Sequence, residues 1–248
     1  MWPRRPTTRS RSVKTRRPTI RIREIVEADD PALTRAYKLL SKSFLRHERV
    51  SLDSWHASLA ERSAGLLTDI AWHLFVAEQD EDVVGLASGT YLGNVNLGVI
   101  GYLAMVPAVR ARGIGTRLRA RLRRQFERDA RQTVDGPLAG VLGEVSVANP
   151  WLRTLASRES VLVLNFQYYQ PSLYDGDKPS PFAFYYESLL RVRSRVPVAE
   201  LRRILFTIWR RIYRVSRPLE DPAFLAMMHS LGSRRSIGPL KFKPARTP

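Results

Sequence analysis

The sequence predicts an α+β fold, and three observations favour it. Strand-like and helix-like segments succeed one another along the chain of 248 residues. Three strand-like segments, at 70–78, 83–92 and 97–105, follow one another closely, which is typical of antiparallel neighbours. A turn with two glycines then leads from the third strand into a long segment of helical periodicity. We therefore expect a sheet that is flanked by helices.

The N-terminal part of the chain predicts one strand followed by two helices. Alternating apolar and charged side chains at 20–26 predict the strand. Asp30 suits the N-cap of a helix, and Pro31 suits its first position. A second helix is expected at about 53–63, with Gly65 beyond its end. The apolar residues expected to face the core are Leu33, Tyr37, Leu40 and Phe44 in the first helix and Trp55 and Leu59 in the second.

The chain after the glycine turn predicts one helix and three further strands. The helix has an apolar stripe on one face and arginines around it. Strands are expected at 138–147, 161–169 and 182–190. The stripe of the helix consists of Leu118, Leu122 and Phe126.

Residues 196–232 predict two more helices. The first is amphipathic, with arginines along the rim of its apolar face. Asp221 and Pro222 mark the start of the second helix, and Gly232 marks its end. We expect this helical extension to pack on the domain, and a helix that binds a membrane surface or a partner protein is the alternative. The apolar face of the first helix consists of Leu201, Ile204, Leu205, Ile208 and Ile212.

The chain has a net charge of +18, and part of this charge lies near its ends. Residues 1–17 are basic and offer nothing to bury, so we expect a disordered tail there. Residues 233–248 predict a second basic tail. Such charge attracts nucleic acid and anionic surfaces, but a solvated surface in an arginine-rich protein gives the same composition. Both interpretations stay open at this point.

The composition makes several kinds of site and location unexpected. The chain has no cysteine, which removes disulfides, thiolate nucleophiles and cysteine-based zinc sites. Its histidines, at positions 47, 56, 73 and 229, have no metal-ligand spacing, so we expect no metal. No apolar run approaches the length that spans a bilayer, so no transmembrane segment is expected. The lack of disulfides fits a cytoplasmic location, which is the one we expect.

The segment 103–118 is the most informative part of the chain. It runs from the end of a strand through Arg110, Gly113 and Gly115, at the spacing R-x-x-G-x-G, into a helical pattern that starts at Thr116. Glycines let the backbone curl so that several N–H groups point at one position, and a helix start adds further unpaired N–H groups. The turn therefore predicts a pocket for an anion such as a pyrophosphate.

The order of strand, R-x-x-G-x-G-T and helix resembles the central motif of the GNAT (Gcn5-related) N-acetyltransferases, over about residues 70–170. Two commoner glycine motifs fit less well, because Leu118 stands where a dinucleotide fingerprint needs glycine and no G-K-[ST] of a P-loop occurs. The resemblance implies the GNAT fold, whose central mixed, mostly antiparallel sheet is flanked by helices and splays open at the cofactor. It assigns this domain to residues 18–195, with 196–232 as an addition.

The resemblance further implies acetyl-CoA, or another acyl-CoA, as co-substrate and a primary amine as the acceptor. The strand before the turn then contacts the pantetheine arm and the acyl carbonyl, and the turn wraps the pyrophosphate. Asn149 matches an asparagine that contacts the pantetheine arm, although Asn-Pro is also an ordinary turn opener. The implied cofactor-binding residues are Leu103, Ala104, Met105, Arg110, Ala111, Arg112, Gly113, Ile114, Gly115, Thr116 and Asn149.

Glu144 is the candidate general base, because family members often carry a glutamate on a central strand. It is the only carboxylate of the strand 138–147, and alternation places it on the face of Leu142, away from Val141 and Val145. A carboxylate among apolar residues is unfavourable unless it is paired or used. Partial desolvation raises the pKa of such a carboxyl and suits it to accept a proton from an amine. A salt bridge to an arginine is the alternative.

The general acid of the family is a tyrosine in the helix after this strand, and the chain departs from that pattern. Residues 150–165 contain no tyrosine. The next candidates are Tyr168 and Tyr169, of which we take Tyr168 as the catalytic candidate, with solvent as the other proton source. Aromatic packing in the sheet is the alternative role of either ring.

These residues together predict an N-acyltransferase that moves an acetyl or other short acyl group from acyl-CoA to a primary amine by direct attack on the thioester. The alternative is a nucleic-acid- or ribosome-associated basic protein with a GNAT-like domain. Aromatic residues do not interleave with the basic segments, which disfavours direct recognition of bases.

Overall fold

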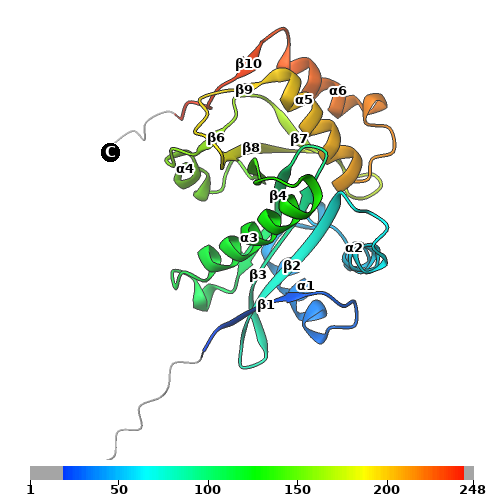
Figure 1. Cartoon of the computed structure of the whole chain (residues 1–248), viewed down its shortest axis with the longest axis vertical. Coiled ribbons are helices and arrows are strands. Elements are labelled where there is room, and N and C mark those ends of the chain that lie inside the picture. Colours follow the sequence, from blue (N-terminus) through cyan, green and yellow to red (C-terminus); the bar gives the residue numbers. More distant parts are fainter. Residues whose placement is uncertain (1–18, 243–248) are drawn as a thin grey trace, which may run out of the picture.

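The computed structural model describes residues 19–242, and an eight-stranded sheet lies at its centre (Figure 1). The strand order is β1-β2-β3-β4-β5-β8-β6, with β7 also paired to β8. Within it β4 and β5 are parallel, and the other neighbours are antiparallel. The strands are β1 (Arg21–Ile25), β2 (Ile70–Gln79), β3 (Asp82–Leu92), β4 (Leu97–Met105), β5 (Gly140–Val145), β6 (Val161–Val163), β7 (Tyr168–Gln170) and β8 (Ser180–Ser188).

Helices cover both faces of the sheet (Figure 1). Alternate residues of β2 and β3 point to opposite faces, so Leu74 and Leu86 pack with α1 and α2 while Phe75 and Ala87 pack with α3. Side chains of α5, η3 and α6 pack with Leu142 of β5, together with residues of β7 and β8. The α-helices are α1 (Pro31–Ser43), α2 (Leu52–Ala64), α3 (Ile114–Val134), α4 (Trp151–Ala156), α5 (Val198–Thr207) and α6 (Pro222–Leu231). Three short 3-10 helices are η1 (Arg46–Glu48), η2 (Pro107–Val109) and η4 (Pro218–Glu220), and η3 (Ile208–Ile212) is a π-helix.

The close approach of α3 to the sheet depends on a glycine of β4. A Cβ atom added to Gly98 would lie 2.1 Å from Cδ2 of Phe126, which is fully buried in the middle of α3. The stripe of Leu118, Leu122 and Phe126 faces the sheet, as its helical spacing predicts. The helix therefore rests on β4 at a position where no side chain separates them.

The two parallel strands part where their pairing stops. β4 and β5 are paired from Leu97 and Gly140 to Ile100 and Gly143, although both strands continue beyond these residues. At the same level Gly101 is an extra residue in β4, because Ser88 of β3 pairs with Tyr102 and Gly89 pairs with Ile100. This bulge bends β4, and within the described residues 19–242 the backbone of β4 beyond it pairs with no strand on the β5 side.

The C-terminal segments differ from the sequence-based expectation in two places. The expected strand 161–169 is split into β6 and β7, because the N–H of Asn165 donates to the carbonyl of Gly238 and the N–H of Leu240 donates to the carbonyl of Val163. Part of the expected tail 233–248 is therefore built into the structure. Its residues Ser236–Ile237 form β10, which pairs with β9 (Val196–Pro197). The expected tail at 1–17 lies outside the described residues.

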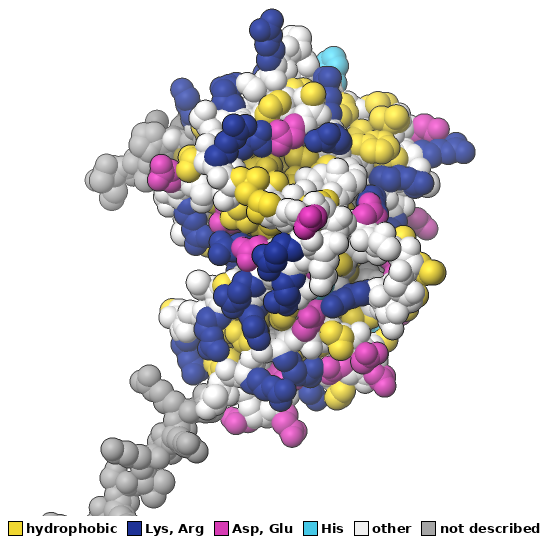
Figure 2. Space-filling view, viewed as in Figure 1, with side chains coloured by type: hydrophobic (Ala, Val, Ile, Leu, Met, Phe, Trp, Pro, Cys, Tyr) yellow, Lys and Arg dark blue, Asp and Glu magenta, His cyan; other side chains and the backbone are white. Residues whose placement is uncertain are grey.

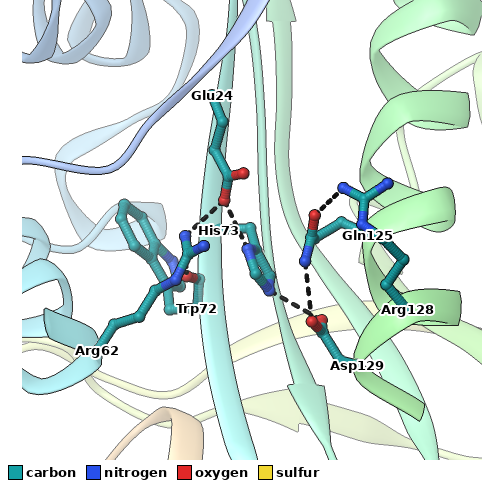
Figure 3. Close-up of polar contacts among 7 residues, drawn as sticks. All are labelled: Glu24, Arg62, Trp72, His73, Gln125, Arg128 and Asp129. Atoms are coloured by element: carbon teal, nitrogen blue, oxygen red, sulfur yellow. Dashed lines mark hydrogen bonds and ion pairs between the residues drawn. The ribbon is translucent and has the colours of Figure 1, made fainter. Parts of the chain in front are cut away.

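A buried polar network ties α3 to the edge of the sheet (Figure 3). His73 of β2 is 1% exposed, and its two ring nitrogens lie 2.7 Å from Glu24 Oε1 and 2.9 Å from Asp129 Oδ2. Gln125 donates to Asp129 at 2.9 Å, and Arg62 of α2 donates to Glu24 at 2.5 Å. Burial favours the neutral form of Glu24, but His73 and Arg62 outweigh it and hold the pKa of that carboxyl below its usual value.

None of the helices within residues 19–242 has the length and apolar character needed to cross a membrane. In the same part of the chain, no three His, Asp or Glu side chains are grouped so that they could hold a metal ion.

Candidate active site

The glycine turn lies between β4 and α3, next to the point where the strands part. The helix begins at Ile114, two residues before the predicted Thr116. Ala111 has φ +60° and Gly113 has φ +73°, so the backbone alternates into the left-handed region and curls. Only glycine adopts that region without strain, which explains the need for it at position 113.

The curled backbone presents free donors. Within residues 19–242, the backbone N–H groups of 111–116 have no hydrogen-bond acceptor, and the N-cap Gly113 has no side chain to supply one. Arg110, Arg112 and Arg117 are exposed around the same turn. Figure 2 shows the surface hollowed between its lower and upper halves, with several Lys and Arg side chains beside the hollow. This arrangement can hold a phosphate group.

The other predicted cofactor residues lie on both sides of the parted strands. Leu103, Ala104 and Met105 form the end of β4, beyond the last pair with β5. Gly115 lies against this strand, since a Cβ atom there would lie 2.7 Å from Cε at the flexible end of the Met105 side chain. Asn149 lies after β5, where its side-chain oxygen accepts a hydrogen bond from the N–H of Trp151 at 3.0 Å. Its side chain therefore caps the start of α4 in this structure.

Glu144 lies near the end of β5, on the face that alternation predicts, and its carboxylate is held by two tyrosines. Tyr168 of β7 donates a short hydrogen bond to Oε1, and Tyr213 donates to Oε2 at 2.7 Å. The salt bridge to arginine considered from the sequence is absent among the described residues, since neither partner is an arginine. Both acceptor oxygens keep lone pairs for a further donor.

Burial and these two hydrogen bonds have opposite effects on the pKa of Glu144. Burial raises the pKa of Glu144 to about 7, and the two hydroxyl donors limit that rise. Burial and the nearby Glu144 carboxylate raise the pKa of Tyr168 and of Tyr213 well above the usual value for a phenol. Near neutral pH both tyrosines therefore keep their protons, and Glu144 changes its charge.

Glu144 opens onto a cavity of about 700 Å³ on the face opposite α3. Its floor includes Ser88 of β3 and Tyr102 of β4, and its walls come from α2, the loop after β7 and the chain around η3. We call this cavity the acceptor pocket, because we propose that it binds the acceptor amine. Aromatic side chains form much of its lining, among them Phe44, Trp55, Trp72, Tyr102, Tyr174 and Tyr213.

Two polar atoms in the acceptor pocket lack partners. Nε1 of Trp55 and Oγ of Ser88 are enclosed, and neither has a hydrogen-bond partner within the described part of the chain. Both residues are 1% exposed. An enclosed donor without a partner is unfavourable, so these two atoms mark positions where a polar group of a ligand gains a hydrogen bond.

Sequence reasoning missed Tyr213, and it placed the nearby arginines on the rim of a helix without assigning them to the site. Tyr213 lies 69 positions after Glu144, in a segment outside the resemblance, and no local pattern connects the two. The only signal in the sequence was that aromatic and basic residues lie close together at 209–214. An amphipathic helix gives the same pattern.

Comparison with known protein families gives a match to one family model. Residues 33–133 match the model of the Acetyltransferase (GNAT) family. This match shows a domain of the GNAT acetyltransferase family at residues 33–133. The fold class and the family expected from the sequence are thereby confirmed. Among curated proteins no match is found.

Solved structures show the same fold. A protein described as a GNAT-family acetyltransferase from Bacteroides thetaiotaomicron is 17% identical, with 79% of this chain and 99% of that chain covered and a TM-score of 0.58. A protein described as an acetyltransferase from Staphylococcus epidermidis is 11% identical, with 68% and 99% covered and a TM-score of 0.50.

Proposed function

We propose that the protein is an N-acyltransferase that moves an acetyl or other short acyl group from acyl-CoA to a primary amine bound in the acceptor pocket. The observation that carries this proposal is the position of Glu144. It lies between the parted strands and an enclosed pocket, and its pKa of about 7 lets it accept a proton near neutral pH.

The turn 110–116 fits the pyrophosphate of acyl-CoA. Its free backbone N–H groups and the start of α3 supply donors and a positive dipole end, and the arginines around it supply charge. The unpaired edge of Leu103, Ala104 and Met105 supplies backbone groups for the pantetheine arm. Asn149 stays in the proposal as a contact that requires its amide to turn away from the N–H of Trp151.

The proposed reaction places few demands on the protein. An amine attacks only in its neutral form, so Glu144 accepts the proton of the acceptor ammonium. The neutral amine nitrogen then bonds to the carbonyl carbon of the thioester and the carbon–sulfur bond breaks. The nitrogen gives up its second proton to solvent, the thiolate takes up one proton, and Glu144 returns its proton to solvent. Tyr168 holds Glu144 and has a raised pKa, which favours solvent as the source of the proton that the thiolate takes up.

Calorimetry with acetyl-CoA tests the cofactor part of this proposal. We expect the unaltered protein to bind acetyl-CoA, and Gly113→Asp to weaken binding by about tenfold or more, because a carboxylate then faces the phosphates. Gly65→Asp is the matched control, since Gly65 has φ +64°, has equally open surroundings and lies at the end of α2. Failure of the unaltered protein to bind acetyl-CoA contradicts the proposal, as does equal binding by Gly113→Asp.

A further inference from the structure

The C-terminal extension reaches into the acceptor pocket through a short irregular segment. The helix α5 continues as the π-helix η3, in which the N–H of Tyr213 donates to the carbonyl of Ile208. Arg214 follows with φ +58°, so the chain turns sharply at this point. Insertions of this kind in helices often occur at functional sites. Here the turn directs Tyr213 at Glu144 and places 210–214 along the pocket.

Three side chains of this segment bridge to three different parts of the domain. Tyr213 donates to Glu144 of β5 at 2.7 Å, Arg211 makes paired contacts of 2.6 and 2.7 Å with Asp69 before β2, and Arg214 donates to Glu61 of α2 at 2.7 Å. We call residues 208–214 the pocket wall. Its inner side is anchored, because Trp209 is fully buried and packs edge-to-face on Phe224 at 5.1 Å.

The pocket wall encloses a space of the size that takes a whole small molecule. A cavity of about 700 Å³ lies within the range of pockets that bury most of a compact ligand. The base Glu144 lies on β5, whereas Ser88 lies on β3, two inter-strand spacings or about 10 Å away. A molecule with an amine at one end and a polar group at the other can contact both positions, and the aromatic lining can cover the part between them.

We infer that the pocket wall of the C-terminal extension restricts this enzyme to small free amines, and that Tyr213 is the positioning residue through which the wall acts on Glu144. The inference rests on the proposed function. The acceptor amine lies at Glu144, and its polar far end takes the unpartnered Trp55 N–H or the Ser88 hydroxyl. A polypeptide acceptor needs room for the chain that continues beyond its amine, and the wall, which is bridged to Asp69 and Glu61, takes up one side of the pocket.

A comparison of acceptors tests the substrate class. Tyramine, 2-phenylethylamine and a short peptide with a free N-terminus and one lysine are incubated with acetyl-CoA and the full chain, and products are followed by mass spectrometry. We expect kcat/KM for tyramine to exceed that for the peptide by about tenfold or more, and Trp55→Phe to remove the preference for tyramine over 2-phenylethylamine. Equal or faster acetylation of the peptide, or acetylation of none of the three, overturns the inference.

A double variant of the wall tests the role of its bridges. Arg211→Ala with Arg214→Ala removes both arginine bridges, and we expect KM for tyramine to rise by about tenfold while the Kd of acetyl-CoA stays the same. The matched control is Arg203→Ala with Arg217→Ala, which removes the same charge from the extension away from the pocket. An unchanged KM overturns the inference. If the unaltered protein does not bind acetyl-CoA, the proposed function is contradicted instead. The failure of the inference and the failure of the proposed function are therefore distinguishable.

Tyr213→Phe tests the positioning role separately, because the ring stays and only the hydroxyl is lost. Removing a donor from the ionised carboxylate raises its pKa, so we expect the acid limb of kcat/KM against pH to move to higher pH. Tyr186→Phe is the control, since Tyr186 is buried on β8 away from Glu144. A limb that stays in place for Tyr213→Phe, in a protein with an unchanged melting temperature, contradicts the positioning role.

Discussion

Tyr213 Oη lies 2.7 Å from Glu144 Oε2 and donates a hydrogen bond to it across 69 positions of sequence. The contact joins the C-terminal extension to the central sheet at the residue that we propose as the general base. Together with the hydrogen bond from Tyr168 to the other oxygen, this contact holds the carboxylate where the parted strands adjoin the acceptor pocket. The extension thus contributes a side chain to the site that we propose.

Glu144→Gln is expected to lower kcat by about 100-fold or more, because the amide cannot accept the proton of the acceptor amine. Its Kd for acetyl-CoA should stay unchanged, since the turn 110–116 is untouched. Steady-state kinetics and calorimetry measure the two quantities. Glu159→Gln, which alters an exposed carboxylate, should leave both unchanged. Full turnover by Glu144→Gln would exclude Glu144 as the base.

The pH dependence of kcat/KM should show one acid limb that Glu144 controls. The base acts only when ionised, and its pKa is about 7. The rate should therefore rise about tenfold per pH unit below this value and level off above it. The limb should be missing in Glu144→Gln. A wild-type profile that levels off already near the usual pKa of a glutamate, about 4.3, would contradict the raised pKa.

The same raised pKa makes the folded protein less stable as the pH rises. Glu144 binds its proton more tightly in the folded state than in the unfolded state, so its contribution is favourable below about pH 4.5 and is lost as the pH passes 7. Glu144→Gln should therefore increase the free energy of unfolding by up to about 3 kcal/mol at pH 8 and by little at pH 4. Urea unfolding at both pH values measures the difference, and an equal effect at the two would contradict it.

Gly98→Ala should destabilise the fold by about 1–3 kcal/mol, because the new methyl group overlaps the ring of buried Phe126. Urea denaturation gives the change. Gly136→Ala is the control, since its Cβ atom would meet only the carbonyl oxygen of Val134 at 3.7 Å. Equal stability of the two variants would show that α3 does not rest on β4 in the way described.

His73→Ala should cost about 3 kcal/mol, because it leaves Glu24 and Asp129 without the group that lies between them (Figure 3). Part of this cost should disappear at low pH, where Glu24 is protonated. Thermal unfolding at two pH values measures both effects. His229→Ala, which removes an exposed ring on α6, should have little effect. A small, pH-independent loss for His73→Ala would contradict the network.

The sequence predicted the parts of the site that are local. The turn between β4 and α3 was predicted from the spacing of Gly113 and Gly115, and the face of Glu144 was predicted from strand alternation. The start of α3 was placed two residues late, because Ile114 and Gly115 carry no helical signal of their own. The roles of the cofactor residues stay predictions until acetyl-CoA binding is measured.

The parts that could not be predicted are long-range contacts. Nothing near Tyr213 in the sequence indicates Glu144 as its partner, and the apolar spacing of 201–212 predicts an α-helix where η3 forms a π-helix. The division of 161–169 depends on backbone hydrogen bonds from residues 238–240, which arrive only after the chain has folded back. His73 has no motif around it, because its partners come from β1 and α3.

The most direct test of the account is a single-turnover reaction of acetyl-CoA with tyramine, in which mass spectrometry follows the acetylated amine for the unaltered protein and for Glu144→Gln. We expect the unaltered protein to form N-acetyl tyramine and to release CoA in equal amounts, and Glu144→Gln to bind acetyl-CoA but form product about 100-fold more slowly. Product formation at equal rates in the two proteins, or no acetyl transfer by the unaltered protein, would contradict the central claim.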